Sequence, residues 1–236
     1  MFKIVLTGGP CGGKSTSMAK LESTLNARGY KVLILPETAT ELILNGIHPS
    51  ENISMDRFQD FVLSKQISKE KLYDEVAKQF DTDKLVILYD RGIGDQLAYI
   101  STDALKEKIN KHKIDLNNAV NRYDLVLHLT TAADGTDAYE WKGSETCGNM
   151  ARSESPEEAI QKDRLTLNGW INAGCEHVKV IDNSTDFDGK ISRILEEVFS
   201  LLGEPTPCEI ERKYLIKKPS LEVLNKLNSC SKSNII

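Results

Sequence analysis

The sequence of 236 residues has no apolar run that approaches about 18 residues, the length at which a helix can cross a membrane. The apolar stretch after its N-terminal Met-Phe-Lys is too short for a signal peptide, and no lipidation motif is present. We therefore expect no transmembrane segment. A net charge of −5 leaves no basic excess, which argues against a nucleic-acid-binding protein.

Cysteine is present without a recognisable pattern. The five cysteines are Cys11, Cys147, Cys175, Cys208 and Cys230. Their number is odd, and no pair has the spacing of a zinc site or a C-x-x-C motif. This usage predicts reduced thiols and a cytoplasmic location.

Hydrophobic residues make up 40% and charged residues 28% of the chain, which is typical of a globular protein. A chain of this length holds one full domain and at most a small second piece. Short apolar runs predict buried strands at residues 2–7, 32–35, 85–89, 125–129 and 178–181, with helical patterns between them. This alternation predicts an α/β fold with a five-stranded parallel sheet flanked by helices.

A glycine-rich turn follows the first predicted strand. Residues 8–15 read Gly8-Gly9-Pro10-Cys11-Gly12-Gly13-Lys14-Ser15, which fits the G-x-x-x-x-G-K-[ST] phosphate-binding loop. Its glycines let backbone N–H groups approach phosphates closely, and the start of the next helix adds partial positive charge. We expect Lys14 to bind the β- and γ-phosphates, Ser15 to bind Mg²⁺ and Thr16 to reach the α-phosphate. The motif predicts a three-layer P-loop NTPase that binds ATP or GTP with Mg²⁺.

An acidic residue ends the third predicted strand. Residues 85–90 read Leu-Val-Ile-Leu-Tyr-Asp, the Walker B pattern, and Asp90 either holds Mg²⁺ or caps the following helix. Ligands of open α/β sheets bind at the carboxyl ends of the strands, which favours the metal. Arg91 follows Asp90 directly, and we expect it to point into the same crevice at the carboxyl ends of the strands. An Asp-Arg pair at this point is typical of nucleoside and nucleotide kinases, in which the arginine contacts the phosphoryl acceptor.

Further candidate catalytic residues surround these motifs. Glu37 follows the second predicted strand and is either a general base for an acceptor hydroxyl or an acidic residue that favours a helix start. Arg152 and Arg164 flank the helix that the capping box at residues 155–158 predicts. Each arginine either closes over the transferring phosphoryl group or forms surface salt bridges. The polar stretch 137–152 predicts a lid.

Residues after the fifth predicted strand are candidates to contact the nucleotide base. They are Asn183 and Ser184, at the same edge of the sheet as the phosphate-binding loop. Gln59 and Gln66 share one face of a predicted helix and are weaker candidates to contact an acceptor. His128 lies within an apolar strand, which predicts a core histidine rather than a ligand.

The motifs occur together with Asp95, Ala98-Tyr99, Arg152-Ser153-Glu154 and the run from Asp182 to Phe187. In this order and spacing they resemble the AAA-type ATPase domain shared by the NadR kinase domain and the TRPL translocation defect protein family. The resemblance covers about residues 1–203. It implies a P-loop domain of the nucleoside- and nucleotide-kinase type.

The character of the sequence changes after Gly203. A Glu204-Pro205-Thr206-Pro207 linker leads to Glu209-Ile210-Glu211-Arg212-Lys213, which resembles the opening E-x-E-x-K strand of a CYTH (triphosphate tunnel) domain. In that fold the glutamates bind a metal and the lysine binds phosphate. A lone strand cannot close a barrel, so we expect residues 204–236 to be a linker and an incomplete CYTH-like strand extension without triphosphatase activity.

Three functions remain open at this point. The first is slow, Mg²⁺-dependent hydrolysis of a bound purine nucleoside triphosphate as a regulatory switch, which the two-domain resemblance favours. The second is phosphoryl transfer to a small molecule, such as nicotinamide riboside or another nucleoside. The third is a non-catalytic, nucleotide-dependent scaffold for a protein or lipid partner. The first two make the protein an enzyme, and we expect one of them.

Overall fold

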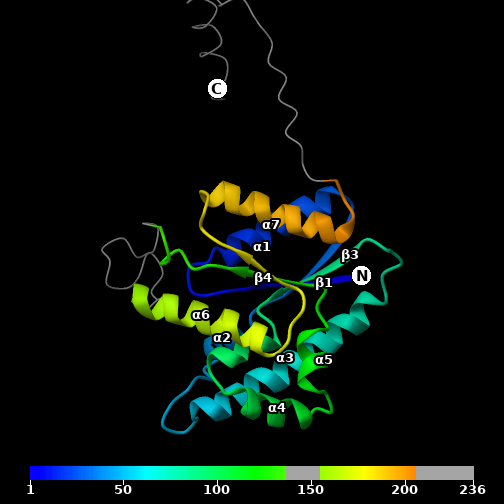
Figure 1. Cartoon of the computed structure of the whole chain (residues 1–236). Helices are drawn as coiled ribbons and strands as arrows, with labels where there is room; N and C mark the ends of the chain where they lie inside the picture. Colours follow the sequence, from blue (N-terminus) through cyan, green and yellow to red (C-terminus); the bar gives the residue numbers. More distant parts are fainter. Residues whose placement is uncertain (137–154, 206–236) are drawn as a thin grey trace, which may run out of the picture. The chain divides into compact units, whose positions relative to one another are not determined.

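A computed structural model describes residues 1–136 and 155–205 (Figure 1). The chain divides into two units, Met1–Thr206 and Pro207–Ile236, and only the first lies among the described residues. Five parallel strands form its sheet in the order β2-β3-β1-β4-β5. The strands are β1 (Phe2–Thr7), β2 (Lys31–Leu35), β3 (Leu85–Asp90), β4 (Leu125–Leu129) and β5 (Val178–Ile181). The predicted α/β fold is therefore confirmed.

Alternating side chains of the central strand point to opposite faces of the sheet, and each face buries its own apolar cluster. Ile4 and Leu6 of β1 join the cluster beneath α1 (Lys14–Ala27) and α7 (Phe187–Leu202). Val5 joins the cluster on the other face, which is covered by α3 (Met55–Ala77), α5 (Leu116–Val120) and α6 (Pro156–Asn172). Figure 1 shows α1 and α7 on one side of the strands and α3, α5 and α6 on the other. Burial on both faces explains why the central strands β1, β3 and β4 are apolar along most of their length.

Six further helices lie between the strands in the described part of the chain. They are α2 (Thr38–Leu44), α3 (Met55–Ala77), the 3₁₀ helix η1 (Ile93–Ala98), α4 (Thr102–Asn110), α5 (Leu116–Val120) and α6 (Pro156–Asn172). The capping box predicted at the start of α6 is present, because Ser155 accepts from the Glu158 N–H and Glu158 accepts from the Ser155 N–H at 2.8 Å. Ser54 is the N-cap of helix α3, because its side chain accepts from the Arg57 N–H at 3.2 Å.

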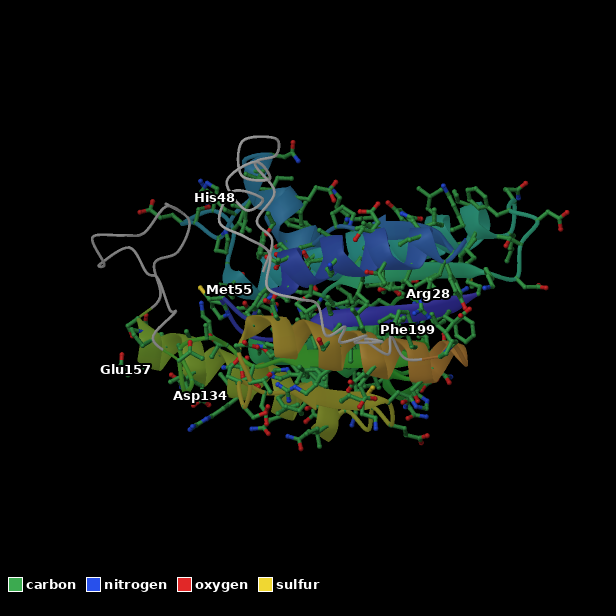
Figure 2. All side chains as sticks on the ribbon, turned by 90° about the horizontal axis from the view of Figure 1, so that it is seen from above. Arg28, His48, Met55, Asp134, Glu157 and Phe199 are labelled. Carbon is green, nitrogen blue, oxygen red and sulfur yellow. The ribbon has the colours of Figure 1, made fainter. Side chains whose placement is uncertain are left out.

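The carboxyl ends of the parallel strands meet at one edge of the sheet. Figure 2 shows Met55, Asp134 and Glu157 at this end, and Arg28 and Phe199 at the opposite end. The loop after β1 therefore lies near the loops that follow the other strands. Among the described residues, no helix is long and apolar enough to cross a membrane. The predicted lid at 137–152, with Arg152, and the CYTH-like segment lie outside the described residues.

Candidate functional site

The phosphate-binding loop, residues 8–15, is shaped by backbone conformations that few residue types adopt. Gly8 has φ +128°, and a Cβ there would lie 2.1 Å from the Leu129 carbonyl oxygen of β4. Only glycine permits both this conformation and this approach. Cys11, with φ +56°, is also left-handed. The loop turns back over the end of β4 and leads directly into α1.

Lys14 lies at the start of α1, and its ammonium group is folded onto the loop. Its Nζ donates to the carbonyl oxygens of Gly8 at 3.1 Å and Gly9 at 2.8 Å. Burial, and next the positive charge of Arg91, lower the pKa of Lys14 to about 8. An anion that replaced these neutral carbonyls would interact more strongly with the ammonium group. The lysine is therefore placed to exchange two loop contacts for a phosphate.

A hollow of about 220 Å³ opens beside this loop, and we call it the phosphate hollow. Its walls include Lys14, Ser15 and Thr16 from the loop and α1, with Asp90 facing them from β3. The Asp90 Oδ1 atom is buried and has no hydrogen-bond partner. Burial, and next the nearby Glu37, raise the pKa of Asp90. A cation in this hollow would stabilise the ionised form of Asp90.

The oxygen atoms in this hollow fit Mg²⁺. Ser15 supplies a hydroxyl and Asp90 a carboxylate, which are the hard ligands that Mg²⁺ prefers. Within residues 1–136 and 155–205, no cluster of three His, Cys, Asp or Glu side chains could hold a metal alone. Such a site resembles those in which substrate phosphates and water complete the coordination of Mg²⁺.

Arg91 follows Asp90 and is held between two carboxylates. Its Nε donates to Glu37 Oε1 at 2.7 Å, and its Nη1 donates to Asp95 Oδ1 at 2.9 Å. The residue has φ +66°, an uncommon conformation for a side chain of this size. Burial alone would raise the pKa of Glu37, but Arg91, Thr40 and Lys14 together lower the pKa below its ordinary value. Glu37 is thus ionised at neutral pH.

Asp95 organises this part of the site, although we named it only within the family resemblance. The residue is 4% exposed, and its carboxylate accepts four hydrogen bonds. Besides Arg91, the donors are the Thr7 hydroxyl at 2.6 Å, the Gly92 N–H at 2.9 Å and the Trp170 indole at 3.3 Å. It joins the end of β1 to η1 and α6. Its place three residues after Gly92, next to the Asp-Arg pair, is the signal that could have identified it.

A second hollow of about 270 Å³ lies next to the phosphate hollow, and Glu37 and Arg91 line both. Its apolar part includes Met55, Phe58 and Val62. Gln59 and Gln66, which the sequence suggested for an acceptor, both line it. Gln66 also accepts from Thr38 and donates to Glu70 at 2.8 Å, so its amide is fixed. The second hollow combines an apolar wall with a charged end, formed by Glu37 and Arg91, that it shares with the phosphate hollow.

The helix α6 contacts the phosphate-binding loop through Asp163. Its Oδ1 atom accepts from the Gly9 N–H at 2.6 Å and from the Thr131 N–H at 3.2 Å. Its Oδ2 atom lies 3.1 Å from Nε2 of His128, which is fully buried, so the prediction of a core histidine is confirmed. We did not single out Asp163, because a mid-helix aspartate has no local motif. Its helical spacing from buried Ala159, Thr166 and Trp170 was the available signal.

The structure does not bring Arg164 to either hollow. The residue is exposed on the outer face of α6, where it lines a separate depression with Glu157 and Leu165. Its neighbour Lys162 lines the second hollow instead. Two residues correspond to about 200° of helix rotation, which explains why these side chains lie on different faces. Arg152 lies outside the described residues.

Asn183 and Ser184 are held within their own loop. The Asn183 amide donates to the carbonyl oxygens of Thr131 at 2.8 Å and Asp134 at 2.7 Å, and its oxygen accepts from Lys190 at 2.8 Å. The Ser184 hydroxyl donates to Asp182 at 2.6 Å. These bonds tie the loop after β5 to the loop after β4.

A family model described as AAA domain matches residues 3–188 of the chain. The chain belongs to the AAA domain family. This AAA domain is thereby placed among P-loop nucleotide-binding domains, which agrees with the motif at residues 8–15. No curated protein matches the chain. The narrower resemblance to the NadR and TRPL translocation defect proteins, and the CYTH resemblance, remain predictions.

Proposed function

We propose that this AAA domain binds a purine nucleoside triphosphate with Mg²⁺ in the phosphate hollow and transfers its γ-phosphoryl group to a small acceptor in the second hollow. The observation that carries this proposal is that the two hollows share a wall. Glu37 and Arg91 line both hollows, and their side chains form a 2.7 Å ion pair. A phosphoryl group held by Lys14 would therefore face the charged end of the second hollow.

Each residue in this region has a role that matches its surroundings. Backbone N–H groups of residues 12–15 and the Lys14 ammonium would bind the β- and γ-phosphates, and Thr16 would reach the α-phosphate, since the Gly9 N–H donates to Asp163 and Pro10 has no N–H. Ser15 and Asp90 would hold Mg²⁺, which neutralises charge on the phosphate oxygens. Arg91, fixed by Glu37 and Asp95, would orient the acceptor and balance the charge of the transferring group.

Glu37 would take the proton of the acceptor hydroxyl. The acceptor oxygen forms a bond to the γ-phosphorus while the bond from that phosphorus to the β,γ-bridging oxygen breaks, and the nucleoside diphosphate leaves. The lowered pKa makes Glu37 a weak base. A loose transition state demands little proton transfer before the bond to the leaving group breaks, so orientation of the hydroxyl is the larger part of this role.

The second hollow is the reason for preferring phosphoryl transfer to the hydrolytic switch. Hydrolysis needs only a water molecule beside the γ-phosphate, whereas this hollow has an apolar wall formed by residues such as Met55, Phe58 and Val62. An apolar wall opposite a charged end suits an organic acceptor with a hydroxyl group, such as a nucleoside. Purine nucleotide, Mg²⁺ and this acceptor are the ligands that the proposal requires.

The test is to measure ADP or GDP formation by the full chain with Mg²⁺ and ATP or GTP, with and without a panel of nucleosides. Phosphoryl transfer predicts that the diphosphate forms in step with a phosphorylated nucleoside. Diphosphate formation at one rate regardless of every nucleoside would instead support the switch. Tight nucleotide binding without turnover would support a scaffold for a protein or lipid partner.

The division of the chain at residues 203 and 204 is part of the same proposal. The P-loop domain, residues 1–203, would carry all the activity, and residues 204–236 would carry none. Hydrolysis of inorganic triphosphate that survives Lys14→Ala but is lost in Glu211→Ala would contradict this division.

A further inference from the structure

An exposed aromatic ring borders the phosphate-binding loop on the side away from the second hollow. Phe187 is the first residue of α7 and is 45% exposed. A Cβ on Gly13 would lie 2.7 Å from Cε2 of this ring and 3.3 Å from Cζ. The edge of the ring therefore rests on the residue before Lys14, while much of the side chain remains open to solvent.

The order of the strands indicates on which side of β1 each end of the proposed nucleotide would lie. Asp90 ends β3 and Glu37 follows β2, two strands on one side of β1, and both residues line the phosphate hollow. The loops after β4 and β5 lie on the other side of β1. If the γ-phosphate faces the acceptor, the nucleoside extends the opposite way, toward β4 and β5. Phe187 stands on that side, in contact with the loop that would hold the phosphates.

The loop that presents Phe187 is held in place by its own hydrogen bonds. Asn183 joins it to the loop after β4 through Thr131 and Asp134. Asp186 caps α7 by accepting from the Gly189 N–H at 2.8 Å. Because the amide group of Asn183 is engaged in these bonds, it is poorly placed to form new ones with a base. A rigid loop with an exposed ring offers stacking instead.

We infer that the ring of Phe187 is the stacking platform for the purine base of the bound nucleotide. The inference rests on the nucleotide binding proposed above. Every base presents a π face, so an aromatic side chain binds bases with little dependence on their hydrogen-bonding edges. ATP and GTP are therefore both expected to use Phe187.

The experiment compares ligands that share the phosphates but differ in the base. Calorimetric titrations of the full chain would use Mg²⁺ with ATP, GTP and inorganic tripolyphosphate. Phe187→Ala and Phe187→Leu should weaken ATP and GTP binding by about tenfold and change tripolyphosphate binding by less than about twofold. Phe187→Tyr should retain the wild-type affinity for all three ligands.

Phe80 offers a matched control, because it is another exposed aromatic side chain and packs near Lys31 at the start of β2, far from the loop. Phe80→Ala should change none of the affinities. Full nucleotide affinity in Phe187→Leu, or equal losses for ATP and tripolyphosphate in Phe187→Ala, would show that the side chain only supports Gly13 and would overturn the inference. Wild-type protein that binds none of the three ligands would overturn the proposed function itself.

Discussion

Asp163 of α6 accepts a 2.6 Å hydrogen bond from the backbone N–H of Gly9 in the phosphate-binding loop. The same helix contacts the other half of the site, because Trp170 donates to Asp95 at 3.3 Å. Lys162, the residue directly before Asp163, lines the second hollow. One helix thus supports the loop for the phosphates, the carboxylate that holds Arg91, and a wall of the proposed acceptor hollow.

Asp163→Ala should weaken nucleotide binding indirectly, through the phosphate-binding loop, because Asp163 bonds to Gly9 of that loop. A hydrogen bond to a charged group contributes about 1.5–3 kcal/mol, and Asp163→Ala removes such a bond from the loop. Because we expect part of the lost free energy to appear as disorder of the loop, the affinity for the nucleotide should fall by about threefold to tenfold. Calorimetry with Mg-ATP measures the effect. Glu158→Gln, a change at the exposed start of the same helix, is the control. Unaltered affinity in Asp163→Ala would show that the Gly9 contact does not shape the loop.

The stabilising effect of Asp163 should depend on pH in the acid range. Burial alone would raise the pKa of Asp163, but His128 and the N–H groups of Gly9 and Thr131 lower the pKa below its ordinary value. When folding lowers the pKa of an aspartate, its ionised form stabilises the folded protein. This stabilisation is fully present above the pKa of the aspartate in the unfolded chain, about 3.9, and is lost as the pH falls through its lower pKa in the folded protein.

Urea unfolding of the wild type and of Asp163→Asn measures this dependence. The difference in their free energies of unfolding should be constant at neutral pH and should shrink as the pH falls below about 4. A difference that stays the same down to the acid limit would mean that the ionised form of Asp163 is not the stabilising one.

The Glu37–Arg91 pair should matter more for turnover than for nucleotide binding. Loss of a general acid–base group costs about 10²–10⁴-fold in rate, and the role of Glu37 in orientation places Glu37→Gln near the lower end of that range. Arg91→Lys should also slow transfer, because a single ammonium group cannot reproduce the fork that reaches both Glu37 and Asp95. Steady-state rates and nucleotide affinities, measured separately for each variant, test whether turnover falls more than nucleotide binding.

Glu41 is a matched control for Glu37, since it lies one turn later and pairs with Lys65 and Lys69 away from the hollows. Glu41→Gln should leave the rate of transfer unchanged. A Glu37→Gln variant that transfers phosphate at the wild-type rate would remove Glu37 from the proposed reaction.

Close packing between η1 and α6 should make Gly94 intolerant of a side chain. A Cβ on Gly94 would lie 2.4 Å from Cδ2 of the fully buried Trp170. Gly94→Ala should lower the free energy of unfolding by about 1–3 kcal/mol, the usual cost of overpacking a core. Thermal and urea denaturation provide the measurement, and an unchanged midpoint would mean that Trp170 can move aside at little cost.

The sequence predicted the features that depend on local patterns. Apolar runs located β1 and β4 with the same bounds that the structure has, because strands buried on both faces are nearly continuous apolar runs in the sequence. The predicted bounds of β5 also match, although Lys179 and Val180 of this edge strand are exposed. The Ser155 capping box marked the start of α6 for a similar reason. The glycine-rich loop was predictable because its motif, its strand and its helix are adjacent in the chain.

The sequence did not reveal features that arise from contacts between distant segments. Asp163 lies 154 positions from Gly9, and Asp95 lies 75 positions from Trp170, so no spacing rule connects them. Arg164 illustrates a different difficulty. The pattern of α6 predicts a helix, but only the phase of the packed helix shows that Lys162, rather than Arg164, lines the second hollow. The sequence likewise did not show that Asn183 bonds to the loop after β4, or that Ser184 bonds to Asp182.

The central claim is that the loop at residues 8–15 binds the triphosphate through Lys14. Calorimetric titration of the wild type, Lys14→Ala and Lys20→Ala with Mg-ATP and Mg-GTP tests it most directly, because Lys20 is an exposed lysine on the same helix. The account predicts binding by the wild type and Lys20→Ala, and an affinity lower by about tenfold or more in Lys14→Ala, since a charge-assisted bond to phosphate is lost. Equal affinities in all three proteins would contradict it.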